Sequence, residues 1–204
     1  MKDAVLALEL STVRGSVAVA AGGEVLFEAS FEARRSHNAQ VFEPLREALA
    51  VAAERLCGIV VGTGPGSYTG VRIAIAAALG IALSRGVPVM GMSSFLGCVD
   101  DADFGVVGDA RRSRFYVAQV RGGALQSEIA LVSAGELEGR MLSAGLNRWI
   151  SCDEKVPLVG LETANPQARR LALKGEKVAW GEIKDGSLEP IYLEGAFITQ
   201  ARKR

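Results

Sequence analysis

The stretch from Gly62 to Arg72 holds the residues of this sequence that most readily suggest chemistry. It reads Gly-Thr-Gly-Pro-Gly-Ser-Tyr-Thr-Gly-Val-Arg and joins a short apolar segment to a longer one. Glycines let a loop aim backbone amides at one anion, and the N-terminus of a following helix adds partial positive charge. A phosphate or carboxylate could bind there, and the residues expected at that contact are Gly64, Pro65, Gly66, Ser67, Thr69 and Gly70. The alternative is that the glycines only turn the chain tightly.

The same loop does not match the common nucleotide-binding or hydrolase motifs. No Lys-Ser or Lys-Thr pair follows its glycines, and the dinucleotide-binding spacing is incomplete. Gly66 directly precedes Ser67, so this serine is not in a Gly-x-Ser-x-Gly elbow. His37 is the one histidine, which leaves no second imidazole for a metal pair or for activating a nucleophile. We expect no complete catalytic centre and no metal site on the isolated chain.

Carboxylates offer one other route to a metal. Four lie close in sequence: Asp100, Asp101, Asp103 and Asp109. They could bind Mg²⁺, but a solvated loop explains the first three more simply. For Asp109 and Arg111 we expect an ion pair or strand-end hydrogen bonds that, with Tyr116, keep two lobes in register. The basic end at 202–204 could touch RNA phosphates, although chain ends are often disordered.

The composition adds no strong electrostatic preference. Lys plus Arg and Asp plus Glu both number 23, so no overall field attracts nucleic acid or an anionic membrane. The three cysteines form no Cys-x-x-Cys pair, which argues against a disulfide framework and suits a reducing compartment. Glu9 interrupts the apolar N-terminal stretch, so neither a signal peptide nor a spanning segment is indicated. We therefore expect a cytoplasmic α/β protein without a membrane contact.

Alternating strands and helices must position the loop. In the first half we expect strands at 4–10, 16–20, 24–31, 59–61 and 88–92, and helices at 38–56 and 71–84. Gly22 and Gly23 form the turn of a hairpin. Pro44 lies early in the first helix, which therefore either begins near it or is kinked. This order indicates a small sheet with helices laid across it.

A second, smaller lobe is expected to follow. Strands are expected at 105–108, 114–121 and 124–132, a capping box at 133–136 opens a helix, and another helix starts at Asn165-Pro166 and stops at Gly175. The lobes are then 1–98 and 99–204, with a boundary within 94–103 and a C-terminal segment that could return to the first lobe.

The helix at 71–84 is unusual because residues 73–84 carry no charge and are apolar on every face. Such a helix must be covered on both sides. The sheet can cover one side, and either the helix at 38–56 or another polypeptide must cover the other. We expect a partner surface that includes Phe42, Leu45, Leu49, Arg72, Ile73, Ala74, Ala77, Ala78 and Ile81.

Several motifs follow one another along the chain: Val5 to Thr12, Ser36-His37, Gly64 to Arg72, Gly91 to Ser94, Asp109-Ala110-Arg111 with Tyr116, and Pro190 to Leu193. In this order and spacing they resemble the bacterial TsaB (YeaZ) family of tRNA threonylcarbamoyladenosine biosynthesis proteins. The most specific is Gly-Pro-Gly-Ser-Tyr-Thr-Gly-Val-Arg. The resemblance covers nearly the whole chain and implies a two-lobed, actin-like fold of the ribonuclease-H-like type.

The resemblance also implies a role. TsaB-like proteins form homodimers and pair, through the two helices of the first lobe, with a TsaD-type catalytic subunit, joined by a TsaE-type ATPase. The implied function is that of a non-catalytic scaffold in tRNA threonylcarbamoylation, with ATP and metal on the partner subunits and only indirect contact with tRNA. Two alternatives stay open: a small-molecule kinase or nucleotide hydrolase of the same superfamily, and a metallopeptidase.

The sequence departs from the family pattern at four positions. Glu9 stands where Asp is usual and Leu10 where Thr is usual, so the first turn is unlike the phosphate loop of active relatives. Arg114 replaces a Glu or Gln and puts a lobe contact at that position in doubt. Glu194 replaces an Arg.

Overall fold

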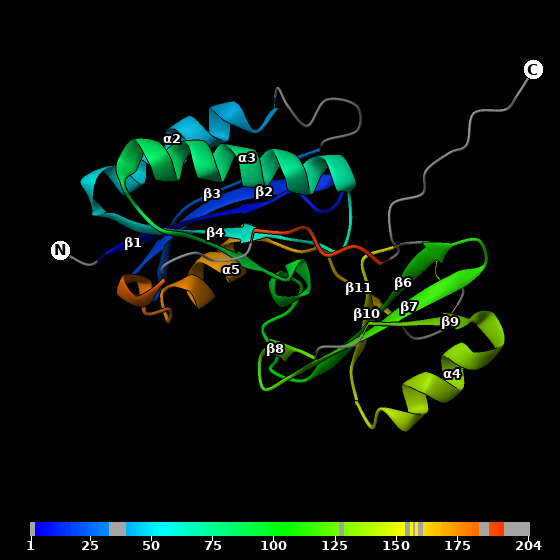
Figure 1. Cartoon of the computed structure of the whole chain (residues 1–204). Helices are drawn as coiled ribbons and strands as arrows, with labels where there is room; N and C mark the ends of the chain where they lie inside the picture. Colours follow the sequence, from blue (N-terminus) through cyan, green and yellow to red (C-terminus); the bar gives the residue numbers. More distant parts are fainter. Residues whose placement is uncertain are drawn as a thin grey trace, which may run out of the picture.

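A computed structural model describes residues 3–32, 40–126, 129–153, 156, 158, 161–183 and 188–193 of the chain. The chain forms two lobes, each built around one β-sheet (Figure 1). The α/β class with two lobes, expected from the order of apolar segments, is confirmed.

The first sheet has the strand order β3-β2-β1-β4-β5. Its strands are β1 (Ala4–Glu9), β2 (Arg14–Ala21), β3 (Glu24–Glu32), β4 (Leu56–Gly62) and β5 (Val89–Met92). The first three strands form an antiparallel meander, whereas β1, β4 and β5 run parallel. The turn between β2 and β3 has positive φ at both Gly22 and Gly23, as the expected hairpin requires.

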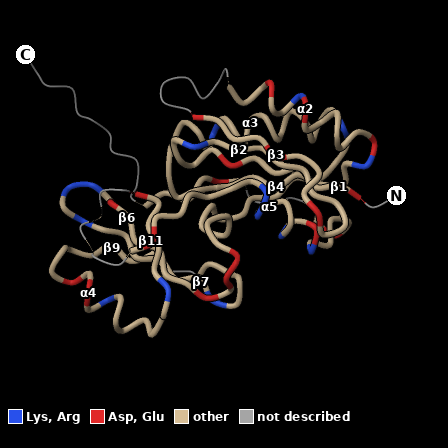
Figure 2. Tube along the Cα trace, turned by 180° about the vertical axis from the view of Figure 1, so that it is seen from behind, with Lys and Arg blue, Asp and Glu red and all other residues tan. Residues whose placement is uncertain are grey.

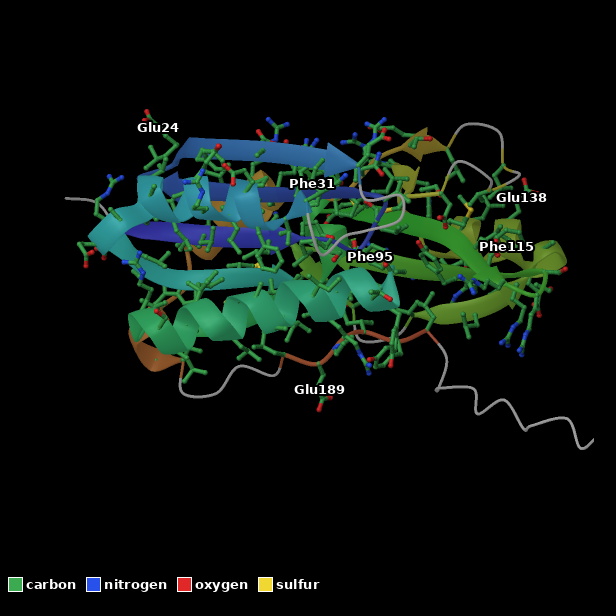
Figure 3. All side chains as sticks on the ribbon, turned by 90° about the horizontal axis from the view of Figure 1, so that it is seen from above. Glu24, Phe31, Phe95, Phe115, Glu138 and Glu189 are labelled. Carbon is green, nitrogen blue, oxygen red and sulfur yellow. The ribbon has the colours of Figure 1, made fainter. Side chains whose placement is uncertain are left out.

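Helices cover both faces of this sheet. On one face lie α2 (Phe42–Ala52) and α3 (Tyr68–Arg85), side by side (Figure 3), and on the other lies α5 (Ala168–Gly175). Successive residues of a strand point to opposite faces. Leu6 and Leu8 therefore pack under α2 and α3, while Val5 and Ala7 pack against α5. This is why β1 is apolar at nearly every position.

The helices that precede and follow the glycine-rich stretch from Gly62 to Arg72, called the motif loop below, begin and end for identifiable reasons. The α2 helix begins at Phe42, so Pro44 lies in the first turn, where backbone N–H groups have no partner inside the helix. Of the two alternatives for Pro44, a helix start or a kink, the structure shows a helix start close to it. The α3 helix begins after Ser67, whose hydroxyl accepts from the Gly70 amide, and ends at Gly86 with φ +65°.

The second sheet has the strand order β11-β10-β6-β7-β8, and β9 also pairs with β7. Its strands are β6 (Phe104–Arg111), β7 (Arg114–Arg121), β8 (Ala124–Leu125), β9 (Ala130–Ser133), β10 (Trp149–Ser151) and β11 (Glu162–Thr163). Helix α4 (Ala134–Ser143) opens with the expected capping box between Ser133 and Glu136.

Three details of the second half differ from expectation. The single strand expected at 124–132 is two short strands, β8 and β9. The helix expected to start at Asn165-Pro166 begins only after Gln167, because the Gln167 amide donates to the Gly97 carbonyl at 2.9 Å and holds this stretch against the lobe junction. Strands β10 and β11 carry too few apolar residues to be recognised from the sequence.

The chain passes between the lobes more than once. It leaves the first sheet after β5 through the 3-10 turn η2 (Ser94–Gly97) and enters β6. Phe95 of this turn lies at the junction of the two lobes (Figure 3). The chain returns to the first sheet with α5, and the Ile191 amide donates to the Thr63 carbonyl at 2.8 Å. The first lobe therefore contains residues from both halves of the sequence.

Candidate functional site

The glycine-rich loop lies between β4 and α3 and is fixed from two sides. From one side, the Ser11 carbonyl after β1 accepts from the Ser67 amide at 2.6 Å. From the other, the Gly64 amide donates to the Ser94 hydroxyl at 2.9 Å, and the Ser94 amide donates to the Gly64 carbonyl at 2.9 Å. The loop therefore connects the strand ends of the first sheet to the junction of the lobes.

Two glycines of this loop allow an unusually close approach of backbones. A Cβ atom on Gly70 would lie 2.0 Å from the Leu10 carbonyl oxygen, and one on Gly66 would lie 2.2 Å from the Ser11 carbonyl oxygen. Any side chain at either position would collide with the turn between β1 and β2. Close packing is thus sufficient to explain these glycines, and an anion contact remains a prediction.

Glu9 is enclosed beneath the same loop. Its side chain is fully buried, Oε1 accepts from the Ser11 amide at 2.6 Å, and Oε2 has no hydrogen-bond partner. Burial raises the pKa of this carboxyl above its usual 4.5, against the opposing effect of the hydrogen bond from the Ser11 amide. A Cβ on Gly62 would lie 1.8 Å from Oε2, so Glu9 fills the space that this glycine leaves.

The raised pKa of Glu9 predicts how stability depends on pH. Because the folded protein disfavours the ionised form, the contribution of Glu9 to stability is complete below pH 4.5 and is lost as pH rises through the folded-state pKa. Glu9→Gln keeps the shape and removes the charge. We expect the variant to melt at a higher temperature than the parent at pH 8, with a smaller difference at pH 4.5, in thermal melts followed by circular dichroism.

An exposed carboxyl provides the control for this experiment. Glu138 lies on the surface of α4, so Glu138→Gln should leave the dependence of the melting temperature on pH as it is in the parent. If Glu9→Gln destabilises the protein equally at both pH values, the buried carboxyl is held ionised by its neighbours and the predicted direction is wrong.

A cleft of about 820 Å³ separates the motif loop from the second lobe. Ser11, Pro65 and Ser67 line one wall, and Asp109, Arg111 and Tyr116 line the other, together with neighbouring residues. The Asp109 carboxylate accepts from the Arg111 amide, and the Asp109 amide donates to the Asp153 carboxylate at 2.9 Å. These strand-end hydrogen bonds lie within the second lobe, so a role of Asp109 and Arg111 in keeping the lobes in register remains a prediction. The Tyr116 ring stacks on Phe95, with ring centroids 5.7 Å apart.

Three exposed side chains cluster at the mouth of this cleft. The Arg72 guanidinium lies 3.9 Å from the centre of the Tyr68 ring and donates to the Tyr192 hydroxyl at 3.1 Å. The sequence indicates Arg72 as a partner contact, and the motif segments contain both tyrosines. No spacing rule could have paired Tyr192 with residues more than a hundred positions away, because the contact depends on the return of the C-terminal segment.

The clustered aspartates form ordinary surface contacts. Asp100 pairs with Arg170 at 3.0 Å, Asp101 pairs with Arg148, and Asp103 accepts from the Gly122 amide. Within the described part of the chain, no group of three or more His, Cys, Asp or Glu side chains is placed to hold a metal ion. His37, Glu194 and the basic end at 202–204 lie outside the described residues.

Comparison with known protein families shows to which family this chain belongs. The family model described as "TsaD: tRNA N6-adenosine threonylcarbamoyltransferase" matches residues 31–180, which is well over half of the chain. The chain belongs to the TsaD family.

Within the TsaD family, the chain is similar to the TsaB (YeaZ) group, as its motifs indicated. It is 35% identical to the "tRNA threonylcarbamoyladenosine biosynthesis protein TsaB" of Escherichia coli over 45% of this chain and 41% of that protein. It is 30% identical to the uncharacterized protein Mb3455c of Mycobacterium bovis over 78% of this chain and 75% of that one. The chain is 33% identical to the uncharacterized protein ML0378 of Mycobacterium leprae, and this match spans only 48% of that protein.

Solved structures show the same fold over almost the whole chain. A Pseudomonas aeruginosa protein described as similar to the peptidase YEAZ superposes with a TM-score of 0.71 and 25% identity, covering 94% of this chain and all of that one. YeaZ from Pseudomonas aeruginosa gives a TM-score of 0.66 at 23% identity over the same shares. The actin-like, two-lobed fold implied by the resemblance is thereby confirmed.

Among the described residues of this TsaD-family chain, only one side of α3 is covered. Val71, Ala74 and Ala78 are buried against the sheet. On the outer side Leu83 is 86% exposed and Leu79 is 41% exposed, with Ala76 and Gly80 exposed between them. The helix has 18 residues and is apolar enough to cross a membrane by length and composition. It packs along the first sheet, however, where it connects β4 to β5.

The structure shows which residues of the expected partner surface are accessible, and the surface itself remains a prediction. Phe42 and Arg72 are exposed, and Leu49, Ile73, Ala77 and Ile81 are partly exposed. The prediction is wrong for Leu45, Ala74 and Ala78, because all three are buried in the core between the helices and the sheet and cannot contact another molecule. The exposed side chains that the expectation omitted are Ala76, Leu79 and Leu83.

Proposed function

We propose that this chain is a non-catalytic subunit in the biosynthesis of threonylcarbamoyladenosine in tRNA, and that it acts by docking α3 onto a TsaD-type catalytic subunit. The observation that carries the proposal is the uncovered outer face of α3. Large exposed apolar side chains in a row are uncommon on a protein that works alone, and they usually mark a surface that another protein covers.

The composition of this face suits a helix as the partner. Ala76 and Gly80 have small or no side chains, so a second helix can approach the α3 backbone closely, while Leu79 and Leu83 provide apolar area beside them. The two faces of α3 thus differ in use: one completes the core and the other is free for association. Charge plays little part, because Asp, Glu, Lys and Arg are interspersed over both lobes rather than gathered on one side (Figure 2).

The names of the relatives support a part in this biosynthesis. TsaB of Escherichia coli and of Bacillus subtilis are named for tRNA threonylcarbamoyladenosine biosynthesis. We propose a cytoplasmic complex in which ATP and metal belong to the TsaD-type subunit and a TsaE-type ATPase, tRNA is contacted only indirectly, and α3 joins two copies of this chain when the TsaD-type subunit is absent.

Reconstitution tests this function directly. With a TsaD-type subunit, a TsaE-type ATPase, ATP, threonylcarbamoyl donor and unmodified tRNA, we expect threonylcarbamoyladenosine to form only when this chain is added. The product is measured by mass spectrometry of nucleosides from digested tRNA. Product formed by this chain alone, or equal product when it is left out, would contradict the proposal.

The cleft favours one alternative, a kinase or nucleotide hydrolase of the same superfamily. Its volume of about 820 Å³ is within the usual range for small-molecule sites. The carboxylate nearest to the turn between β1 and β2, Glu9, is however fully buried and cannot reach a metal-bound phosphate in the cleft. Titration calorimetry with ATP and Mg²⁺ separates the two functions, because the enzyme must bind and turn over ATP by itself.

A further inference from the structure

Two of the three cysteines lie in contact at the junction of the lobes. The Sγ atoms of Cys98 and Cys152 are 3.6 Å apart although 54 positions separate the residues in the sequence. Cys98 follows η2 and Cys152 follows β10, and both belong to the apolar cluster around Phe95 and Tyr116. A disulfide bond is about 2.05 Å long, so the two sulfurs need to approach by roughly 1.5 Å to become bonded.

The two thiols differ in their access to small molecules. Cys152 is partly exposed and lines the cleft, whereas Cys98 is only 3% exposed. The hydrogen bond with Cys152 and burial raise the pKa of the Cys98 thiol well above its usual 9.0. A reagent entering the cleft therefore meets Cys152 first, with Cys98 directly behind it as an intact thiol.

We propose that Cys98 and Cys152 form an oxidation site at which a small peroxide produces an intramolecular disulfide. In the first step the Cys152 thiolate attacks one peroxide oxygen, the O–O bond breaks, and the departing hydroxide is protonated to water, which leaves a sulfenic acid on Cys152. In the second step the Cys98 sulfur attacks the Cys152 sulfur, the S–O bond breaks, and the hydroxide leaves with the Cys98 proton as water. The sulfurs are oxidised and the peroxide is reduced.

The position of the bond determines its effect. It would close the chain from 98 to 152 into a covalent loop that contains β6, β7 and α4. It would also anchor β10 to the segment in which Ser93 and Ser94 hydrogen-bond to Gly64 of the motif loop. The disulfide would thus link Cys152, in the second-lobe wall of the cleft, to the segment that holds Gly64 in the opposite wall. The site consists of the two thiols alone, and its oxidation is independent of the proposed function.

Treatment of the intact, reduced protein with hydrogen peroxide tests the site. We expect the mass of the chain to fall by about 2 Da, the free thiols to fall from three to one, and a Cys98–Cys152 peptide pair to appear in a non-reducing digest. Closing so long a loop should raise the thermal midpoint by about 5 to 10 °C, and dithiothreitol should reverse the shift. No variant is needed for these measurements, so a folding defect cannot obscure them.

Cys57 supplies the matched control because it lies on β4, in a different apolar cluster. Cys57→Ser should leave the mass change and the thermal shift intact, whereas Cys152→Ser should abolish both. Three free thiols after treatment, a disulfide that includes Cys57, or a sulfinic acid on Cys152 with Cys98 still reduced would each overturn the proposal.

Discussion

Leu83→Glu is expected to weaken the association of this chain with a TsaD-type subunit about 100-fold while leaving the chain folded. Leu83 is 86% exposed near the end of α3, so the folded chain alone gains no buried charge from the substitution. In a complex the carboxylate would be placed without a partner in an apolar contact, which costs about 3 kcal/mol. Binding is measured by surface plasmon resonance and folding by circular dichroism.

Leu142→Glu is the matched control for this substitution. Leu142 is another highly exposed leucine near the end of a helix, but it lies on α4 of the second lobe, at 77% exposure. The same change of residue type should therefore leave the affinity within about two-fold of the parent. If Leu83→Glu also binds as the parent does, the outer face of α3 is not the docking surface, even if the complex itself forms.

The choice of Leu83 illustrates what the sequence could and could not predict about α3. Its apolar composition correctly indicated a helix with one face on the sheet. That another polypeptide covers the second face remains a prediction. Which residues belong to which face did not follow, because periodicity locates a buried stripe only when polar residues mark the opposite side. Ala74 and Ala78 face the sheet because of the direction in which α3 leaves the loop after Ser67.

The parts of the fold that depend on local rules were predictable in advance. Hairpin glycines and the capping box at Ser133 each act within a few residues, and each is present in the structure. Helix α5 also ends at the expected Gly175, but this glycine lies against Val5 and Val60 of distant strands. Contacts between distant segments were not predictable. The fully buried Glu9, the stack of Tyr116 on Phe95 and the contact of Cys98 with Cys152 all depend on how the strands are ordered in space.

Gly70→Ala is expected to destabilise the protein by about 3 kcal/mol, measured by urea unfolding. The new methyl group would lie 2.0 Å from the Leu10 carbonyl oxygen, which belongs to the backbone and cannot rotate away as a flexible side chain would. Relief requires α3 to move off the end of β1 and break the Ser67 cap, so the free energy of unfolding falls. The same shift would move Tyr68 and Arg72, so partner binding should weaken as well.

Gly80→Ala distinguishes this collision from an effect of helix propensity. Gly80 lies in the same helix, and a Cβ there has no atom within 4 Å, so the substitution should stabilise the protein by about 0.5 to 1 kcal/mol. The two variants make the same chemical change with opposite expected signs. Equal stabilisation by both would mean that the loop does not press against the turn after β1, and that its glycines serve another purpose, such as exposing amides to an anion.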